Sequence, residues 1–148
     1  MEKPIVLIVD DNEATCTLLT ALLQRDFVVE TASDGIEAIE KLKSREYASI
    51  LLDLLMPHAD GYAVLDYLTA ERPAMVKRVL VVTAALAARH MDRVRQYDIC
   101  NVIAKPFEVE TLFTAVKRCT GEEDVRSIRG PFVSSGMILL LAEVLKRV

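Results

Sequence analysis

The sequence contains no tryptophan and few of the residues that break helices or cross-link chains. Its 148 residues include five Gly, five Pro and three Cys, and aromatic residues make up 5% of the total. This composition excludes collagen-like and low-complexity chains. The cysteines, Cys16, Cys100 and Cys119, form no CxxC pair. We therefore predict neither a disulfide framework nor a zinc site, a pattern that suits a reducing cytoplasm.

Long apolar runs and a strong charge of either sign are also missing. The apolar run at 137–142 is far shorter than the roughly 18 residues of a membrane span. The N-terminal segment has an acid too early for a signal peptide. We therefore expect a soluble, cytoplasmic protein that does not contact membranes. The net charge of −4 argues against electrostatic binding of nucleic acid, and 52% apolar residues suffice for the core of one domain.

Short apolar runs alternate with segments of helical period. Four continuously apolar runs are typical of strands buried on both faces of a parallel sheet, at 5–9, 50–52, 79–82 and 102–104. Residues 28–32 are more polar and alternate, as in an edge strand. We expect helices at 13–25, from Asp34, at 61–71, at 85–97 and after Pro106. These strand–helix pairs predict a right-handed, doubly wound α/β sheet ending near Gly121.

Two of these helices carry specific predictions about burial. Asp34 is placed as the N-cap of its helix, with Glu37 three residues later, and we expect Ile36, Ile39 and Leu42 to be buried. In the helix at 85–97, the apolar stripe is formed by Ala87, Met91 and Val94.

Polar side chains follow the predicted strands at their carboxyl ends, where parallel α/β sheets place ligands. They are Asp10, Asp11, Asp53, Thr83 and Lys105. Each alone has a commoner explanation, such as a helix cap or a polar strand end, but the combination is specific. Three neighbouring carboxylates repel one another, and Mg²⁺ (or Mn²⁺ in its place) with oxygen ligands would offset that repulsion. Asp53 is then a candidate nucleophile for an acyl phosphate, with Lys105 and Thr83 as partners of the phosphoryl oxygens.

This set resembles the response-regulator receiver family of two-component signalling over roughly residues 4–120. The matching motifs are VDD, LLDLLMPHADGY, Thr83 with Ala84, and KPF from Lys105. The resemblance implies a flavodoxin-like sheet of order 2-1-3-4-5. It also implies phosphorylation of Asp53 by a sensor histidine kinase or a histidine phosphotransfer protein.

The same resemblance implies a site and a switch. Asp10, Asp11, Asp53 and the backbone carbonyl of Leu55 look like the ligands of Mg²⁺. Thr83 and Ala84 look like the segment that moves on phosphorylation and carries the fourth helix with it. The chain would then be a phosphoacceptor switch, which self-catalyses only its own phosphotransfer and dephosphorylation, rather than an enzyme.

The match departs from the family pattern at three places. Receivers often carry an aromatic switch residue three positions before the lysine. By this resemblance Val102 takes that switch position here, although a valine has no ring to rotate in or out. Leu55 and Ala85 have no polar group to orient an attacking water, which favours a long-lived acyl phosphate. His58 lies beside the site, most simply as a solvated side chain, and the sequence names no partner for His90.

The sequence divides near residue 121, into an expected receiver at 1–121 and an extension at 122–148. The extension is a polar linker followed by a helical stripe at Met137, Leu140, Leu141, Val144, Leu145 and Val148. This helix could fold back on the receiver, form a dimer contact or bind a partner, or the chain could be a fragment of a longer protein. A homodimer could also form through the last two predicted helices of the receiver.

Two other functions remain open. A binding adaptor would keep the fold and signal by protein contact without phosphorylation. A phosphatase with an aspartyl nucleophile would usually carry a second Asp two residues after the first, where this sequence has Leu55. We expect a phosphoacceptor with no attached output domain, because the extension is too short for a DNA-binding module.

Overall fold

A computed structural model describes residues 2–121 of the chain. Residues 122–148, which include the predicted C-terminal helix, lie outside the described residues. Along the chain the elements are β1 (Ile5–Val9), α1 (Glu13–Leu23), β2 (Val28–Ala32), α2 (Gly35–Ser44), β3 (Ser49–Leu52), α3 (Gly61–Glu71), α4 (Pro73–Val76), β4 (Val79–Thr83), α5 (Ala88–Val94), β5 (Asn101–Ala104) and α6 (Val109–Cys119).

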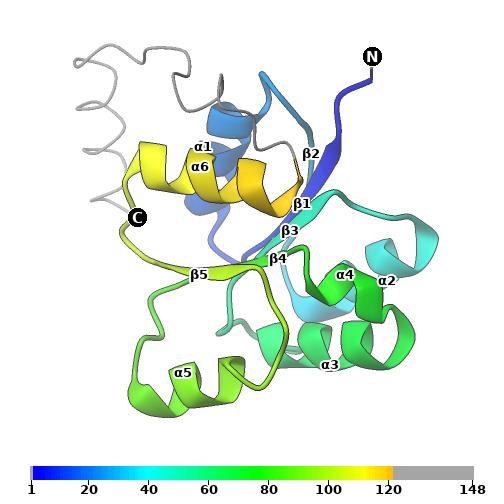
Figure 1. Cartoon of the computed structure of the whole chain (residues 1–148), viewed down its shortest axis with the longest axis vertical. Coiled ribbons are helices and arrows are strands. Elements are labelled where there is room, and N and C mark those ends of the chain that lie inside the picture. The colour runs from blue at the N-terminus through cyan, green and yellow to red at the C-terminus, as the bar shows by residue number, and fades with distance from the viewer. Residues whose placement is uncertain (1, 122–148) are drawn as a thin grey trace.

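The five strands form one parallel sheet in the order β2-β1-β3-β4-β5. Helices α1 and α6 cover one face, and α2, α3, α4 and α5 lie on the other (Figure 1). This confirms the predicted doubly wound fold and its strand order. Within residues 2–121, no helix combines the length and apolar character needed to cross a membrane.

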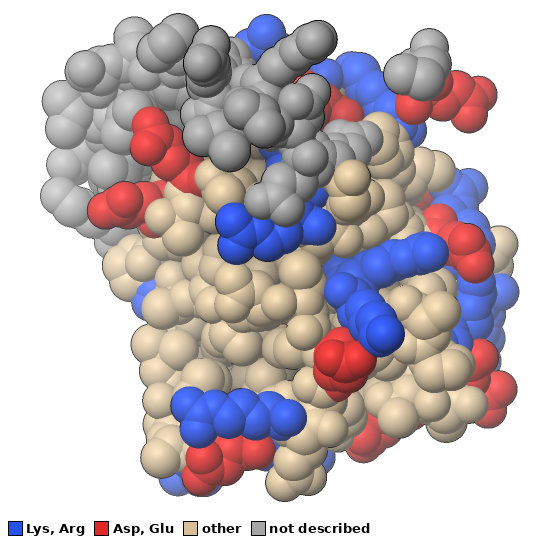
Figure 2. Space-filling model, in the orientation of Figure 1, with Lys and Arg blue, Asp and Glu red and all other residues tan. Residues whose placement is uncertain are grey.

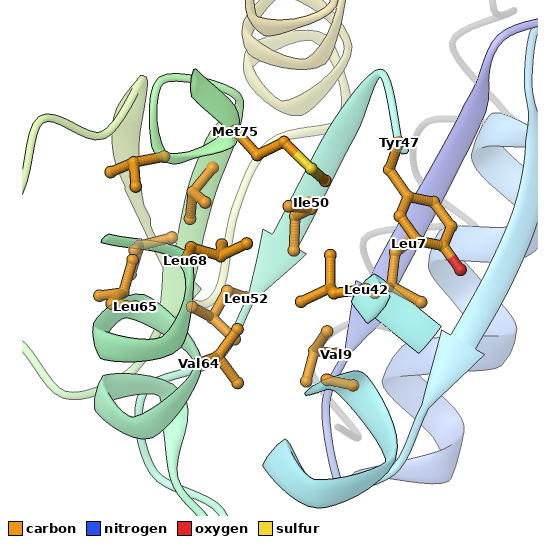
Figure 3. Packing of buried hydrophobic residues seen from close by; sticks show 14 of the residues in the cluster. Leu7, Val9, Leu42, Tyr47, Ile50, Leu52, Val64, Leu65, Leu68 and Met75 are labelled. Carbon is orange, nitrogen blue, oxygen red and sulfur yellow. The ribbon is translucent and has the colours of Figure 1, made fainter. Parts of the chain in front are cut away.

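The core consists of two apolar clusters, one on each face of the sheet. Alternate residues of β1 supply both, since Val6 and Ile8 face α1 and α6 while Leu7 and Val9 face the opposite layer. Figure 3 shows the second cluster, in which side chains from β1, β3, α2 and α3 meet. Strands buried on both faces explain why β1, β3 and β4 read as continuous apolar runs.

Three local predictions were wrong. The strand after residue 100 is an edge strand, β5, in which only Ile103 is fully buried, because it pairs with β4 alone among the described residues. Ile36 is 57% exposed, since α2 directs Ala38 and Leu42 to the core. The expected helix at 85–97 covers only Ala88–Val94, which leaves Ala87 exposed before its first turn. In addition, the short helix α4 was not predicted.

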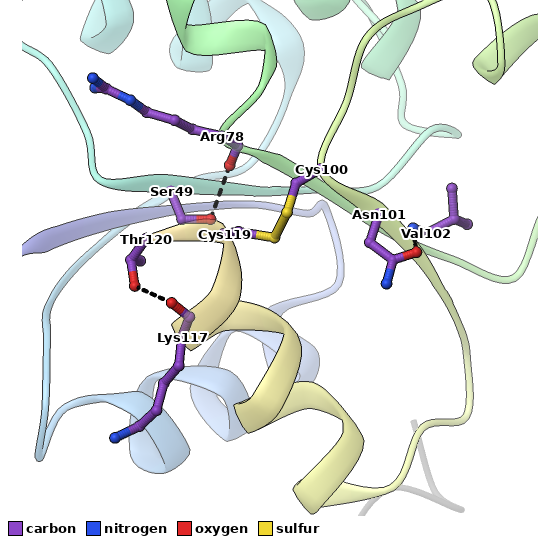
Figure 4. The surroundings of a disulfide bond; sticks show 8 residues. All are labelled: Ser49, Arg78, Cys100, Asn101, Val102, Lys117, Cys119 and Thr120. Atoms are coloured by element: carbon purple, nitrogen blue, oxygen red, sulfur yellow. Dashed lines mark hydrogen bonds between the residues drawn. A yellow bond between two sulfur atoms is a disulfide. The ribbon is translucent and has the colours of Figure 1, made fainter. Parts of the chain in front are cut away.

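The prediction about cysteines was also wrong. Cys100 and Cys119 form a disulfide, with their Cα atoms 5.8 Å apart (Figure 4). Cys100 immediately precedes β5 and Cys119 ends α6, and the return of α6 along the sheet brings these two ends together. Sequence spacing could not reveal this, because the 19-residue separation depends on how α6 packs. Cys16 is unpaired.

Candidate functional site

A lysine joins two aspartates at the carboxyl edge of the sheet. The Lys105 ammonium lies 2.6 Å from Oδ2 of Asp10 and 3.3 Å from Oδ2 of Asp53, although these residues are 95 and 52 positions away in the sequence. The three side chains are largely buried, with exposed fractions of 19% for Lys105, 4% for Asp10 and 12% for Asp53. The structure therefore brings three of the predicted site residues into direct contact.

The ladder of the sheet sets this geometry. The N–H of Asp53 donates to the carbonyl of Val9, so the ends of β3 and β1 stand side by side. The N–H of Lys105 donates to the carbonyl of Thr83, which fixes the end of β5 against the end of β4. Because all the strands are parallel, the residues that follow them share one edge.

The carboxylates of Asp10, Asp11 and Asp53 are close enough to share a ligand. One oxygen from each lies within 4.8 Å of the others. Asp10 and Asp53 are largely buried, whereas Asp11 is exposed. Carboxylate oxygens are the ligands that Mg²⁺ and other hard cations prefer, so this donor set fits such an ion.

Burial and pairing act in opposite directions on the charged groups. Burial raises the pKa of the Asp10 carboxyl above its usual range, and the hydrogen bond from Lys105 only partly offsets this. Burial alone would lower the pKa of Lys105, but its hydrogen bond to Asp10 and the charge of Asp53 outweigh burial and raise that pKa. Lys105 is therefore held as a cation between two acids.

Local structure holds the loops around this site. Oδ1 of Asp10 accepts the N–H of Asn12, and the Asn12 side chain caps α1 by accepting the N–H of Thr15. On the other side, Gly61 lies against the backbone of β3's end. A Cβ at Gly61 would lie 2.4 Å from the carbonyl oxygen of Asp53, so only glycine permits this approach.

The remaining predicted site residues do not contact the Lys105 ion pairs, and they differ in burial. Thr83 is fully buried, and its hydroxyl accepts the N–H of Ala85 rather than contacting the acids. Ala84 is exposed in the loop that follows, and Leu55 is 53% exposed. Val102 is half-buried against the second core cluster. The proposed roles of the Leu55 carbonyl and of Val102 as a switch position stay predictions.

Of two further residues near the site in the sequence, Cys16 contacts the site, and His58 lies in an exposed loop. His58 is exposed and has a positive φ of 66°, as in a tight loop turn. Cys16 was not predicted to be part of the site, yet its thiol lies 3.3 Å from the carbonyl oxygen of Asp10. Burial raises the pKa of this thiol to about 11, so it remains a protonated donor rather than a reactive thiolate. No signal in the sequence distinguished Cys16 from a core residue.

His90, for which the sequence named no partner, belongs to a second polar cluster. Its Nδ1 lies 2.8 Å from the hydroxyl of Tyr62, on α3. The two residues are 28 positions apart on different helices, so only the packing of α5 against α3 could reveal the pair.

Known proteins match this chain over most of the described residues. The family described as response regulator receiver domain matches residues 6–117. Hybrid signal transduction histidine kinase D of Dictyostelium discoideum is 31% identical over 77% of this chain and 7% of its own length. Transcription factor SKN7 of Chaetomium thermophilum is 30% identical over 79% of this chain and 15% of its own length. The chain thus spans only a small part of these two relatives.

Solved structures with the same fold include receiver domains. The receiver domain of a sensor histidine kinase from Pseudomonas aeruginosa, described with a magnesium ion in its active site cleft, is 26% identical with a TM-score of 0.73, covering 80% of this chain and 98% of that one. Chemotaxis protein CheY4 of Vibrio cholerae is 25% identical with a TM-score of 0.71, covering 79% and 98%. From its fold and the match over 6–117, the chain belongs to the response regulator receiver domain family.

Proposed function

We propose that Asp53 accepts a phosphoryl group from a phosphohistidine and that the modified domain switches conformation to signal to a partner protein. The donor would be a sensor histidine kinase or a histidine phosphotransfer protein. The observation that carries this proposal is the Lys105 ammonium, held between Asp10 and Asp53 at the carboxyl edge of the sheet. Membership of the receiver family supports the same role.

The transfer uses groups that the chain itself supplies. An oxygen of the Asp53 carboxylate attacks the phosphorus, a new P–O bond forms, and the P–N bond to the donor imidazole breaks as the imidazole leaves with the bonding electrons. Lys105, which is already in place, provides positive charge for the phosphoryl oxygens. Because Asp10 holds Lys105 at 2.6 Å, the ammonium need not be ordered during the reaction. In this sense the phosphotransfer is self-catalysed.

Asp10, Asp11 and Asp53 would hold Mg²⁺, or Mn²⁺ in its place, with the carbonyl of Leu55 as a further predicted ligand. When bound, the ion would neutralise negative charge on the transferring phosphoryl group. The magnesium described in the Pseudomonas aeruginosa receiver supports this assignment.

The switch begins at Thr83. Its hydroxyl accepts from Ala85, and it can rotate to donate to a phosphoryl oxygen on Asp53. Such a rotation would release the N–H of Ala85 and move the exposed loop from Ala84 that leads into α5. The phosphoryl group would then bias a two-state equilibrium that a partner reads.

A binding adaptor without phosphorylation is not favoured, because it gives no role to Lys105 or to the carboxylate cluster. The downstream partner would be a protein. In the face that Figure 2 shows, basic and acidic side chains are interspersed, with no broad basic area for nucleic acid. A cytoplasmic location, a homodimer through α5 and α6 or through residues 137–148, and a separate role for the extension stay predictions.

Labelling with a small phosphodonor tests this function. With acetyl phosphate and Mg²⁺, we expect one acid-stable, hydroxylamine-labile phosphoryl group per wild-type chain. We expect no label when a chelator is present from the start of the reaction. Asp53→Asn should abolish the label. Asp60→Asn is the matched control, because it removes a nearby carboxylate while Asn can still cap α3.

Two results would contradict the proposal. A folded wild-type chain that takes up no label would support the adaptor. Sustained turnover of the phosphodonor without accumulated label would support a phosphatase.

A further inference from the structure

Tyr62, His90 and Arg93 form a compact cluster between α3 and α5. The Tyr62 side chain is buried, and its hydroxyl lies 2.8 Å from Nδ1 of His90. The two rings are stacked with an interplanar angle of 14° and centroids 6.0 Å apart. The guanidinium carbon of Arg93 lies 3.7 Å from the centroid of the Tyr62 ring, within the range of a cation–π contact.

One side of this cluster is fixed to the phosphoacceptor strand. Tyr62 follows Gly61, whose N–H donates to the carbonyl of Leu54 and whose Cα leaves no room for a side chain beside Asp53. The first turn of α3 is also capped by Asp60. The Tyr62 backbone therefore moves with the end of β3.

The other side of the cluster belongs to a helix with few apolar anchors. α5 has seven residues, of which only Val94 is fully buried, and it begins four residues after Ala84. Met91 adds a partly buried contact with the core. Because so little apolar area of α5 itself is buried, the contacts to Tyr62 help to fix its position, together with the hydrogen bond from Tyr97, just after the helix, to Asp66 on α3.

Val102 offers no comparable connection. It is half-buried, and an aliphatic side chain has neither a hydroxyl to donate nor a ring to reorient. Val102 therefore has no polar or aromatic group that could link the site to α5 in the way that Tyr62 does.

We propose that Tyr62, His90 and Arg93 act as a clasp that couples the occupancy of Asp53 to the position of α5. This proposal rests on the proposed function for its trigger, but the clasp itself is a property of the unmodified protein. Two routes would connect Asp53 phosphorylation to α5. Thr83 is linked to α5 along the chain, and Tyr62 is linked to it by its side-chain contact with His90.

The clasp favours two discrete positions of α5 over a graded movement. Burial raises the pKa of the Tyr62 hydroxyl, so it stays protonated and needs an acceptor. If α5 moves away from α3, that hydroxyl loses His90 and the ring loses Arg93 in the same step. A buried polar group that loses its partner is costly, so intermediate positions are disfavoured.

Hydrogen exchange of the unmodified protein tests the clasp directly. We expect Tyr62→Phe and His90→Ala each to speed exchange of the amides at 88–94 roughly threefold to tenfold, as for a lost neutral hydrogen bond. The double variant should fall short of the two single effects combined, because both substitutions remove the Tyr62–His90 hydrogen bond and only His90→Ala also removes the ring contact. Tyr67→Phe is the matched control, since Tyr67 also lies on α3 and its hydroxyl has no hydrogen-bond partner among residues 2–121.

Beryllofluoride with Mg²⁺, which mimics a phosphoryl group on Asp53, tests the coupling. We expect it to change exchange at 88–94 in wild type and Tyr67→Phe, and to lose most of that effect in Tyr62→Phe. Exchange around residue 53 should change in all three proteins, which shows that the probe binds to each.

The outcomes separate the clasp from the proposed function. If Tyr62→Phe leaves exchange at 88–94 unchanged, or if the effects of Tyr62→Phe and His90→Ala add, the clasp does not exist. If Tyr62→Phe retains the full response of 88–94 to beryllofluoride, the clasp does not couple α5 to the site. If beryllofluoride alters nothing near residue 53 in wild type, the proposed function fails, while the exchange of the unmodified variants still decides whether the clasp forms.

Discussion

Reduction of the Cys100–Cys119 disulfide should lower the free energy of unfolding of the domain by an amount that depends on the length of the loop that the bond closes. The bond closes a loop of 19 residues between the start of β5 and the end of α6. In the chain-entropy description, a loop of this length removes about 11 cal/mol/K from the unfolded ensemble, or about 3 kcal/mol at 25 °C. Reduction removes no side-chain atom and requires only that the two sulfurs move apart, so the packing of Cys119 in the first core cluster should change little.

The expected shift in melting temperature follows from the size of the domain. About 120 folded residues correspond to an unfolding entropy of about 0.25 kcal/mol/K, so a loss of about 3 kcal/mol lowers Tm by roughly 10–15 °C. Thermal unfolding followed by circular dichroism, with and without reductant, measures this shift. Peptide mapping under non-reducing conditions establishes the redox state of each sample.

The matched control is Cys16→Ala, which removes the unpaired thiol and leaves the disulfide intact. This variant should respond to reductant as wild type does. The reasoning fails if mapping shows complete reduction while Tm moves by less than about 3 °C, because loop closure would then not be what the bond contributes. Mapping that finds free thiols at both positions in the oxidised protein would refute the pairing itself.

Three further perturbations have expected results. Leu55→Asn with Ala85→Glu should speed loss of the acyl phosphate, because a polar group can orient water; an unchanged rate in a dephosphorylation assay would contradict this. Gly61→Ala should lower the urea midpoint by the equivalent of about 1–3 kcal/mol, since its Cβ would lie 2.4 Å from a carbonyl oxygen; a midpoint within 0.5 kcal/mol, roughly the scatter of neutral surface changes, would contradict it. Hydrogen bonds from the N–H and hydroxyl of Ser33 lower the pKa of Glu37, so its stabilising contribution is present above the unfolded pKa of about 4.3 and is lost as pH falls through the lower folded value. The urea midpoints of wild type and Glu37→Gln should therefore differ at pH 7 and converge in acid, and a constant difference would contradict this.

The sheet and the acidic site could be predicted because their signals are local and the geometry of parallel strands is regular. An apolar run predicts a buried strand, and the aspartate that follows it, Asp10 or Asp53, marks the carboxyl end of that strand. Once the strands are parallel, the convergence of these side chains with Lys105 requires no further information. The short distances from Lys105 to both acids agree with that inference.

Other features depend on packing that local patterns do not encode. Val102 and its neighbours are apolar like those of β3, yet β5 is an edge strand, because strand order rather than composition sets burial there. Ile36 fits a helical stripe and is still exposed, since the sheet is covered by the side of α2 that carries Ala38. The Tyr62–His90 pair depends on the angle between two helices that are far apart in the sequence.

The charge of the site favours a bound cation beside Asp10 and Asp11. Three carboxylates face one ammonium there, which leaves a formal charge of −2 before any phosphoryl group arrives. Two like unit charges 4 Å apart repel by about 4 kcal/mol at an effective dielectric constant of 20. Lys105 alone cannot balance this set together with a dianion on Asp53. Asp10 and Asp11, which directly follow β1, would therefore oppose the modification unless a divalent cation accompanied it.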